Sequence, residues 1–237
     1  MSNPIYLDNA STSHPKPESV YRSMDKVVRL SANPGRGGHR QTLKLDRLVF
    51  DTREAVADLF GVRDSSRIVF TANATMAINI ALFGLLTPGD RVITSSMEHN
   101  AVTRPLRILQ ERGVQVIKVS GDRSGYVDLD ALRRTCLAAP TRMVVLNHCS
   151  NVTGTMQSIE ELGPWCRQHG ILFMVDGSQS AGSFPLNLDA LAINLFTAPG
   201  HKGLLGPQGT GLLYLRQGVE PAPLLYGGTG GNSHADM

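Results

Sequence analysis

A single lysine, Lys202, lies in the glycine-rich segment 200–206, GHKGLLG, between two apolar runs. Upstream of it, Asp176 directly follows the apolar run 173–175, which is typical of a buried strand. These are the two groups that a pyridoxal 5'-phosphate (PLP) enzyme needs, because a lysine binds the cofactor's aldehyde and a carboxylate keeps its pyridine nitrogen protonated. We therefore expect PLP as the cofactor. A lysine with a purely structural role in a glycine turn is the alternative.

The segment 71–76, TANATM, joins a predicted strand to a predicted helix with small and hydroxyl-bearing residues. Backbone N–H groups at the start of a helix attract anions, because they have no acceptor within the helix and lie at the positive end of its dipole. Asn73, Ala74 and Thr75 are therefore predicted to bind the cofactor's phosphate. An ordinary N-cap, which small polar residues supply in many helices, is the alternative.

Three further polar side chains are placed to surround a planar ring. His99 follows the next predicted strand, where an imidazole can stack on a cofactor or carry a proton. Asn151 follows another strand, in the segment 147–154, NHCSNVTG, and its amide suits a ring oxygen or a substrate carboxylate. Gln179 reaches the ring's phenolic oxygen if Gly177 lets the backbone turn. A surface histidine and a plain asparagine-rich turn are the alternatives for the first two.

These residues require a scaffold of alternating strands and helices. The spacing of apolar residues predicts helices over 17–30, 42–60, 74–86, 103–112, 129–137 and 159–169. It predicts strands over 67–71, 91–94, 115–119, 143–147, 171–175, 194–197 and 211–215, the last two as a hairpin-like pair around the lysine turn. This alternation predicts an α/β fold, with a mostly parallel sheet covered by helices on both faces. Ligands of such folds bind at the carboxyl ends of the strands.

The composition is that of an ordinary globular protein. The 237 residues are 41% hydrophobic and 18% charged, with a net charge of +3 and scattered basic residues, so we expect no nucleic-acid binding. No apolar run reaches membrane-spanning length and no signal peptide is recognisable, so the predicted location is the cytoplasm, without membrane association. Cys136, Cys149 and Cys166 lie far apart without metal-ligand spacing, which predicts reduced thiols and no metal site.

In order and spacing, these motifs resemble the class V aminotransferase family of fold-type I PLP enzymes, and within it the cysteine desulfurase and selenocysteine lyase branch. The resemblance runs from Tyr6 to about Gly231. The segments 6–12, YLDNAST, and 33–39, NPGRGGH, are similar to two family motifs near the active site, the second through His39. The resemblance implies phosphate binding by Asn73, Ala74, Thr75 and His201, stacking by His99, ring-oxygen contacts by Asn151 and Gln179, the pyridinium contact by Asp176, and covalent attachment by Lys202.

The chain departs from the family pattern in two respects. Many relatives have a phosphate-binding serine where this chain has Pro199, which offers neither a hydroxyl nor an N–H. The resemblance makes Thr229 a candidate substitute, acting on the phosphate of a partner subunit. The family also continues beyond the position of Met237 into a small domain, which holds the catalytic cysteine loop and the arginine that binds the substrate carboxylate. None of the three cysteines matches the catalytic position.

The resemblance implies a PLP-dependent cysteine desulfurase, which removes sulfur from L-cysteine to give alanine and an enzyme persulfide. We expect residues 1–15 to form a segment near the active site, 16–226 the PLP-binding domain, and 227–237 the start of the connection to the small domain. A homodimer and a sulfur-accepting protein are the expected assemblies. The alternatives are another class V enzyme, such as a selenocysteine lyase or an aminotransferase, and a PLP-binding fragment without turnover.

Overall fold

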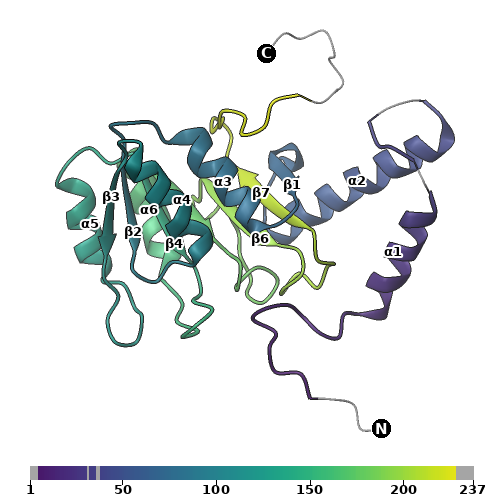
Figure 1. Ribbon diagram of the computed structural model, residues 1–237, viewed down its shortest axis with the longest axis horizontal. Coiled ribbons are helices and arrows are strands. Elements are labelled where there is room, and N and C mark those ends of the chain that lie inside the picture. The colour runs from purple at the N-terminus through teal and green to yellow at the C-terminus, as the bar shows by residue number, and fades with distance from the viewer. Residues whose placement is uncertain (1–4, 31, 36–37, 228–237) are drawn as a thin grey trace.

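A computed structural model describes residues 5–30, 32–35 and 38–227 of the chain (Figure 1). An irregular N-terminal segment leads into helices α1 (Glu18–Leu30) and α2 (Arg40–Leu59) and the short 3₁₀ turn η1 (Ser65–Arg67). The remaining helices are α3 (Ala74–Leu85), α4 (Asn100–Glu111), α5 (Leu129–Leu137) and α6 (Ile159–Gln168). The strands are β1 (Ile68–Thr71), β2 (Arg91–Ser95), β3 (Gln115–Val119), β4 (Met143–Asn147), β5 (Leu172–Asp176), β6 (Leu195–Pro199) and β7 (Gly211–Leu215).

The strands form one sheet in the order β1-β7-β6-β5-β4-β2-β3. The pairs β6·β5, β5·β4, β4·β2 and β2·β3 are parallel, whereas β7 runs antiparallel to both of its neighbours, β6 and β1. The predicted mostly parallel sheet is therefore confirmed, and so is the hairpin-like pair around the lysine turn.

Helices cover both faces of the sheet. On one face, the buried side chains of α3 and α4 pack on Val92, Met143, Met174, Leu195 and Leu213. On the other face, α5, α6 and the end of α2 pack on the side chains that alternate with these, such as Ile93, Val144 and Phe173. Because both faces are buried, the central strands are almost uninterrupted apolar runs, as expected of a parallel sheet.

Helices α1 and α2 differ from the rest of the molecule. They extend to one side of the sheet (Figure 1), and α1 contains no buried residue. In α2 the buried residues are Thr42, Leu45 and Ala57, and only the last belongs to a core cluster. We refer to residues 18–59 as the N-terminal arm, and to residues 60–219 as the sheet unit.

Two predicted boundaries are wrong in an informative way. Helix α4 begins at Asn100 and not at Thr103, because the ring of His99 caps it by accepting a hydrogen bond from the Ala101 N–H at 3.1 Å. Strand β5 extends through Asp176, so this carboxylate belongs to the strand itself. Asp176 is therefore the last residue of a packed strand, and His99 is fixed as the N-cap of a packed helix.

Candidate active site

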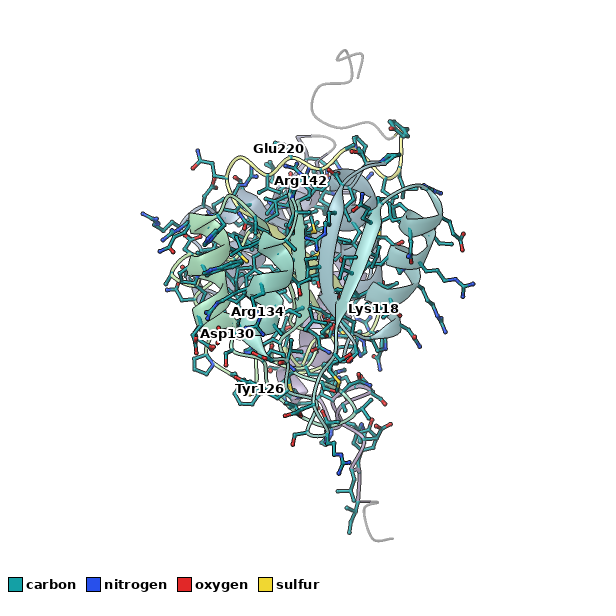
Figure 2. All side chains as sticks on the ribbon, turned by 90° about the vertical axis from the view of Figure 1, so that its left-hand side faces the viewer. Lys118, Tyr126, Asp130, Arg134, Arg142 and Glu220 are labelled. Carbon is teal, nitrogen blue, oxygen red and sulfur yellow. The ribbon has the colours of Figure 1, made fainter. Side chains whose placement is uncertain are left out.

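The site lies at the carboxyl ends of the parallel strands. In Figure 2, Arg142, which precedes β4, and Glu220, which follows β7, mark one end of the sheet, and Tyr126, in the loop after β3, marks the other. At that second end, Asn147, Asp176 and Thr197 are register neighbours on β4, β5 and β6. Paired residues share a face, so these three side chains follow the apolar face that α3 and α4 cover. Asn147 and Asp176 border the cavity of the site and form its floor, whereas Thr197 is fully buried beside them.

Asp176 is the most constrained residue of the floor. It is 3% exposed, and Oδ1 accepts hydrogen bonds from the Ser178 N–H at 2.9 Å and the Ser178 hydroxyl at 2.5 Å. Among the described residues, none donates a hydrogen bond to Oδ2. Burial raises the pKa of the Asp176 carboxyl, while the Ser178 bonds and the nearby His99 and Lys202 act to lower it. The carboxylate therefore has one satisfied oxygen and one that is available to a cationic donor.

Lys202 lies in the turn that joins β6 to β7. The turn is closed by hydrogen bonds from the Leu205 N–H to the Lys202 carbonyl at 2.8 Å and from the Gly206 N–H to the Gly200 carbonyl at 2.7 Å. A Cβ at Gly200 would overlap the Thr210 side chain, so the chain needs glycine for this close approach. Burial lowers the pKa of the Lys202 amine, although the charge of Asp176 opposes this shift. The lowered pKa favours the uncharged, nucleophilic form of the amine.

The start of α3 forms the predicted anion cup. The Asn73 side chain caps the helix by accepting a hydrogen bond from the Met76 N–H at 2.8 Å. The N–H groups of Ala74 and Thr75 lie in the first turn and have no acceptor within the helix. Both predictions for this segment are therefore compatible with the structure, since the cap uses one N–H and leaves two for an anion.

His99 and Gln179 already have partners that fix their orientation. Because Nδ1 of His99 accepts the Ala101 N–H, a neutral ring carries its proton on Nε2. Gln179 donates from Nε2 to the carbonyl of Ala10 at 3.0 Å, so the side chain holds the N-terminal segment. Its amide nitrogen has a second hydrogen, which remains available for a ligand oxygen.

A half-buried acid, Glu98, precedes His99 and turns its carboxyl group inward. Glu98 accepts a hydrogen bond from the Ser95 hydroxyl at 2.6 Å, and its Oε2 is buried without a partner among the described residues. Burial raises the pKa of Glu98 to about 8, with the Ser95 bond opposing and the charge of Asp176 adding to the shift. At neutral pH this acid is therefore largely protonated.

These groups surround one cavity of about 350 Å³. Its lining includes nine of the predicted site residues, namely Asn73, Ala74, Thr75, His99, Asn151, Asp176, Gln179, His201 and Lys202. Thr229, the tenth, lies outside the described residues. His39 is absent from the described lining; its side chain caps α2 by accepting the Thr42 N–H at 3.4 Å.

Sequence reasoning missed several members of the site. Ser178 is the clearest, although Asp-x-Ser is the spacing of a turn in which a carboxylate accepts the N–H two residues later, and this signal could have found it. Ala10, Ser11, Ala101 and Asn147 also line the cavity without having been assigned a role. Ala10 and Ala101 carry no polar side-chain group that a sequence pattern would single out. Ser11 and Asn147 are polar and lie in the segments 6–12 and 147–154, which were expected near the site, but neither residue was singled out there.

Comparison with known proteins agrees with this geometry. The sequence profile of the family described as aminotransferase class-V matches residues 5–233. The chain belongs to this family. Its members, like the cysteine desulfurases, depend on PLP. A probable cysteine desulfurase of Methanothermobacter thermautotrophicus is 39% identical over 94% of the chain, and a cysteine desulfurase, IscS, of Dictyoglomus turgidum is 32% identical over 98%. The chain covers 56% and 59% of the lengths of these two relatives, so it spans little more than half of each.

Solved structures of proteins at least 30% identical to this chain show the same fold. An apo cysteine desulfurase from Thermococcus onnurineus superposes with a TM-score of 0.84 at 33% identity, covering 90% of this chain and 54% of the other. A protein described as SspA in complex with cysteine gives a TM-score of 0.87 at 30% identity, with 94% and 65% covered. Within the described part of the chain, no helix is long and apolar enough to cross a membrane, and no three potential metal ligands cluster.

Proposed function

We propose that this chain binds PLP in the cavity between Lys202 and Asp176. The observation that carries the proposal is the buried carboxylate of Asp176, whose Oδ2 has no donor among the described residues although the carboxylate borders the cavity. A protonated pyridine nitrogen is a donor of the required charge, and it would stabilise the carboxylate that burial alone disfavours. Lys202 lines the same cavity and offers an amine whose pKa is lowered by burial.

Different residues of the cavity would bind different parts of the cofactor. Lys202 would hold the cofactor covalently, Asp176 would keep a proton on its ring nitrogen, and the N–H groups of Ala74 and Thr75 would bind its phosphate together with His201. When bound, PLP supplies an electron sink for bonds broken at the substrate's α-carbon. Once its amine is free, Lys202 is placed to move protons at that carbon. His99, with Nδ1 engaged, presents Nε2 as its exchangeable proton site.

For the whole protein we propose a cysteine desulfurase, with L-cysteine as substrate and alanine as a product. The relatives described above support this reaction. The reaction needs a thiolate that accepts the sulfur, and the three cysteines of this chain are poor candidates for it. Burial raises the pKa of all three thiols, that of Cys136 to about 11, so none is a ready thiolate. We infer that the sulfur-accepting thiol is none of these three. Turnover of selenocysteine, transamination, or cofactor binding without turnover are the competing outcomes.

We further propose a homodimer in which the N-terminal arm covers a partner. Exposed apolar side chains gather on α2 and β1, among them Leu48, Phe50 and Phe70. A neighbouring cavity of about 410 Å³ is lined by apolar residues of α2 and by the Lys202 turn, including Leu204 and Pro207. An interface there would place the two active sites beside it, as expected for a phosphate contact by Thr229 of a partner subunit.

We propose the same domain limits as the sequence predicts. Residues 1–15 lie beside the site, 16–226 form the PLP-binding domain, and 227–237 begin the connection to a small domain. A sulfur-accepting protein is the proposed second partner. The three unpaired cysteines agree with a reducing compartment, and the cytoplasm is the proposed location.

An absorbance experiment tests cofactor binding. Purified protein mixed with PLP should show the visible band of lysine-bound PLP, and Lys202→Ala should abolish it, whereas Lys118→Ala, on the exposed strand β3, should retain it. Identical spectra for wild type and Lys202→Ala would refute the cofactor assignment. Release of sulfide and alanine from L-cysteine, against L-selenocysteine and a heat-killed control, then distinguishes the desulfurase from its competitors.

A further inference from the structure

One backbone oxygen beside the active lysine has an unusual number of donors. The carbonyl oxygen of His201, in the peptide bond to Lys202, receives the Ser13 N–H at 3.0 Å, the Thr12 hydroxyl at 2.9 Å, the Ser13 hydroxyl at 3.1 Å and the Lys16 ammonium at 3.2 Å. A carbonyl has two lone pairs and ordinarily accepts one or two hydrogen bonds. All four donors come from the N-terminal segment, which is more than 180 residues away in sequence.

Of these donors, Lys16 is the one whose burial costs the fold the most free energy, because it carries a charge. It is 9% exposed, and its ammonium contacts the Ser13 hydroxyl at 2.9 Å and the Ser13 carbonyl at 3.3 Å in addition to His201. Among the described residues, no carboxylate forms an ion pair with it. Burying an ammonium against neutral oxygens alone costs free energy, because dipoles replace only part of its hydration. The charge is therefore held at this carbonyl at the expense of stability.

The same N-terminal segment touches the site at a second point. Gln179 donates to the Ala10 carbonyl at 3.0 Å, and Ala10 and Ser11 line the cavity. Thr12 also contacts the His201 ring, with Oγ1 and Nδ1 3.0 Å apart. The segment is thus a wall of the cavity that is fastened to two proposed cofactor-binding residues, Gln179 and His201.

We propose that Lys16 is a positioning residue for Lys202: with Thr12 and Ser13, it holds the His201–Lys202 peptide by its carbonyl oxygen and so fixes where the Lys202 amine enters the cavity. The hydrogen bonds inside the turn join other carbonyls, those of Lys202 and Gly200, so the His201 carbonyl is the point at which the turn is anchored from outside. Burial first, then the charges of Lys202 and Lys16, lower the pKa of the His201 ring and keep it neutral. The consequence for cofactor affinity rests on the proposed function, whereas the anchoring of the turn does not.

Hydrogen exchange in the cofactor-free protein tests the anchoring directly. Lys16→Met keeps the length of the side chain and removes its charge, and it should accelerate amide exchange in residues 200–206 about tenfold while leaving α3 and β4 unchanged. Lys16→Arg keeps a cationic donor and should stay within about twofold of wild type. Lys26→Met, on the exposed surface of α1, is the matched control and should have no effect.

PLP titration then tests positioning. Lys16→Met should raise the Kd for PLP about tenfold, and Lys16→Arg should restore it. If Lys16→Met unfolds the chain, Thr12→Val removes one donor of the same carbonyl and should cause a smaller, equally local rise in exchange. Unchanged exchange at 200–206 in the folded variants overturns the proposal, and so does faster exchange with an unchanged Kd. If the wild type itself fails to bind PLP, the proposed function fails, while the exchange result still decides the anchoring.

Discussion

The sheet unit and the N-terminal arm both contain helices with apolar side chains, yet they bury those side chains very differently. In α3, five residues are buried, and the helix packs between α4 and the sheet. In α1, no residue is buried, and apolar side chains such as Tyr21 and Met24 are nearly half exposed. A helix in water needs a partner surface for its apolar stripe, so the difference indicates that the sheet unit is complete in itself and the arm is not.

The largest expected effect contrasts the two regions by side-chain truncation. Leu82→Ala, at a fully buried position of α3, should lower the free energy of unfolding by about 2–5 kcal/mol, because it leaves a cavity in the core. Met24→Ala in α1, where the side chain is 43% exposed, should change it by no more than about 0.5 kcal/mol. Urea unfolding of both variants measures this. Similar losses for the two would contradict the contrast.

The inward-facing carboxyl group of Glu98 should make the stability of the sheet unit depend on pH. Glu98 has a folded pKa of about 8, far above that of an unfolded glutamate, so the folded state holds the proton more tightly. Wild-type stability should therefore fall as pH rises from about 4.5 to about 8, by up to about 1.4 kcal/mol per pH unit. Glu98→Gln keeps an acceptor for Ser95 and carries no charge, so it should become progressively more stable than wild type across this window.

The matched control is Asp51→Asn on the exposed surface of α2, which should show no such divergence from wild type. Thermal unfolding at pH 5, 6, 7 and 8 provides the measurement. Parallel pH profiles for wild type and Glu98→Gln would show that this carboxyl does not carry the proton we assign to it.

A smaller effect concerns self-association through the arm. Phe50→Ser, on the exposed apolar face of α2, should weaken the proposed dimer by about 10- to 100-fold while leaving the monomer's stability unchanged. Leu137→Ser, at an exposed position of α5 in the sheet unit, should leave the dimer intact. Sedimentation velocity over a concentration series compares them. A wild type that stays monomeric at every concentration would remove the arm's proposed partner.

The smallest effect compares the helix caps of the two regions. Asn73→Ala should cost about 1 kcal/mol, because the Asn73 side chain satisfies the Met76 N–H at the packed start of α3. His39→Ala should cost less, although His39 Nε2 also lies 3.0 Å from the Thr42 hydroxyl, because its hydrogen bond to the Thr42 N–H is long, at 3.4 Å, and only the other end of α2 belongs to a core cluster. Urea midpoints with unchanged slopes give both values; an equal or reversed order would contradict the weaker anchoring of the arm.

The sequence predicted the sheet unit well because its apolar periodicity and its packing agree. The limits of β3, β4, α5 and β7 were predicted to the residue, and nine of the proposed site residues share one cavity. What escaped prediction depends on contacts between distant segments. His99 extends α4 through a ring-to-backbone bond, and Lys16 reaches the His201 carbonyl across most of the chain. Neither contact produces a periodic pattern in the sequence. Each depends on hydrogen bonds made by one side chain, whereas helices and strands are recognised from apolar residues that recur along one face.

Gly211 has a consequence for how the cavity selects its ligand. This residue pairs with Thr71 on one side and Pro199 on the other, so it joins the strand before the anion cup to the strand before the lysine turn. A Cβ at this position would lie 2.6 Å from the carbonyl carbon of Asn73, so the backbone of Asn73 packs directly against Gly211. The spacing between the end of β6, where the Lys202 turn begins, and the first turn of α3 is consequently fixed by the sheet. For the proposed ligand, this spacing would limit how far its aldehyde carbon can lie from the phosphate that the start of α3 would bind.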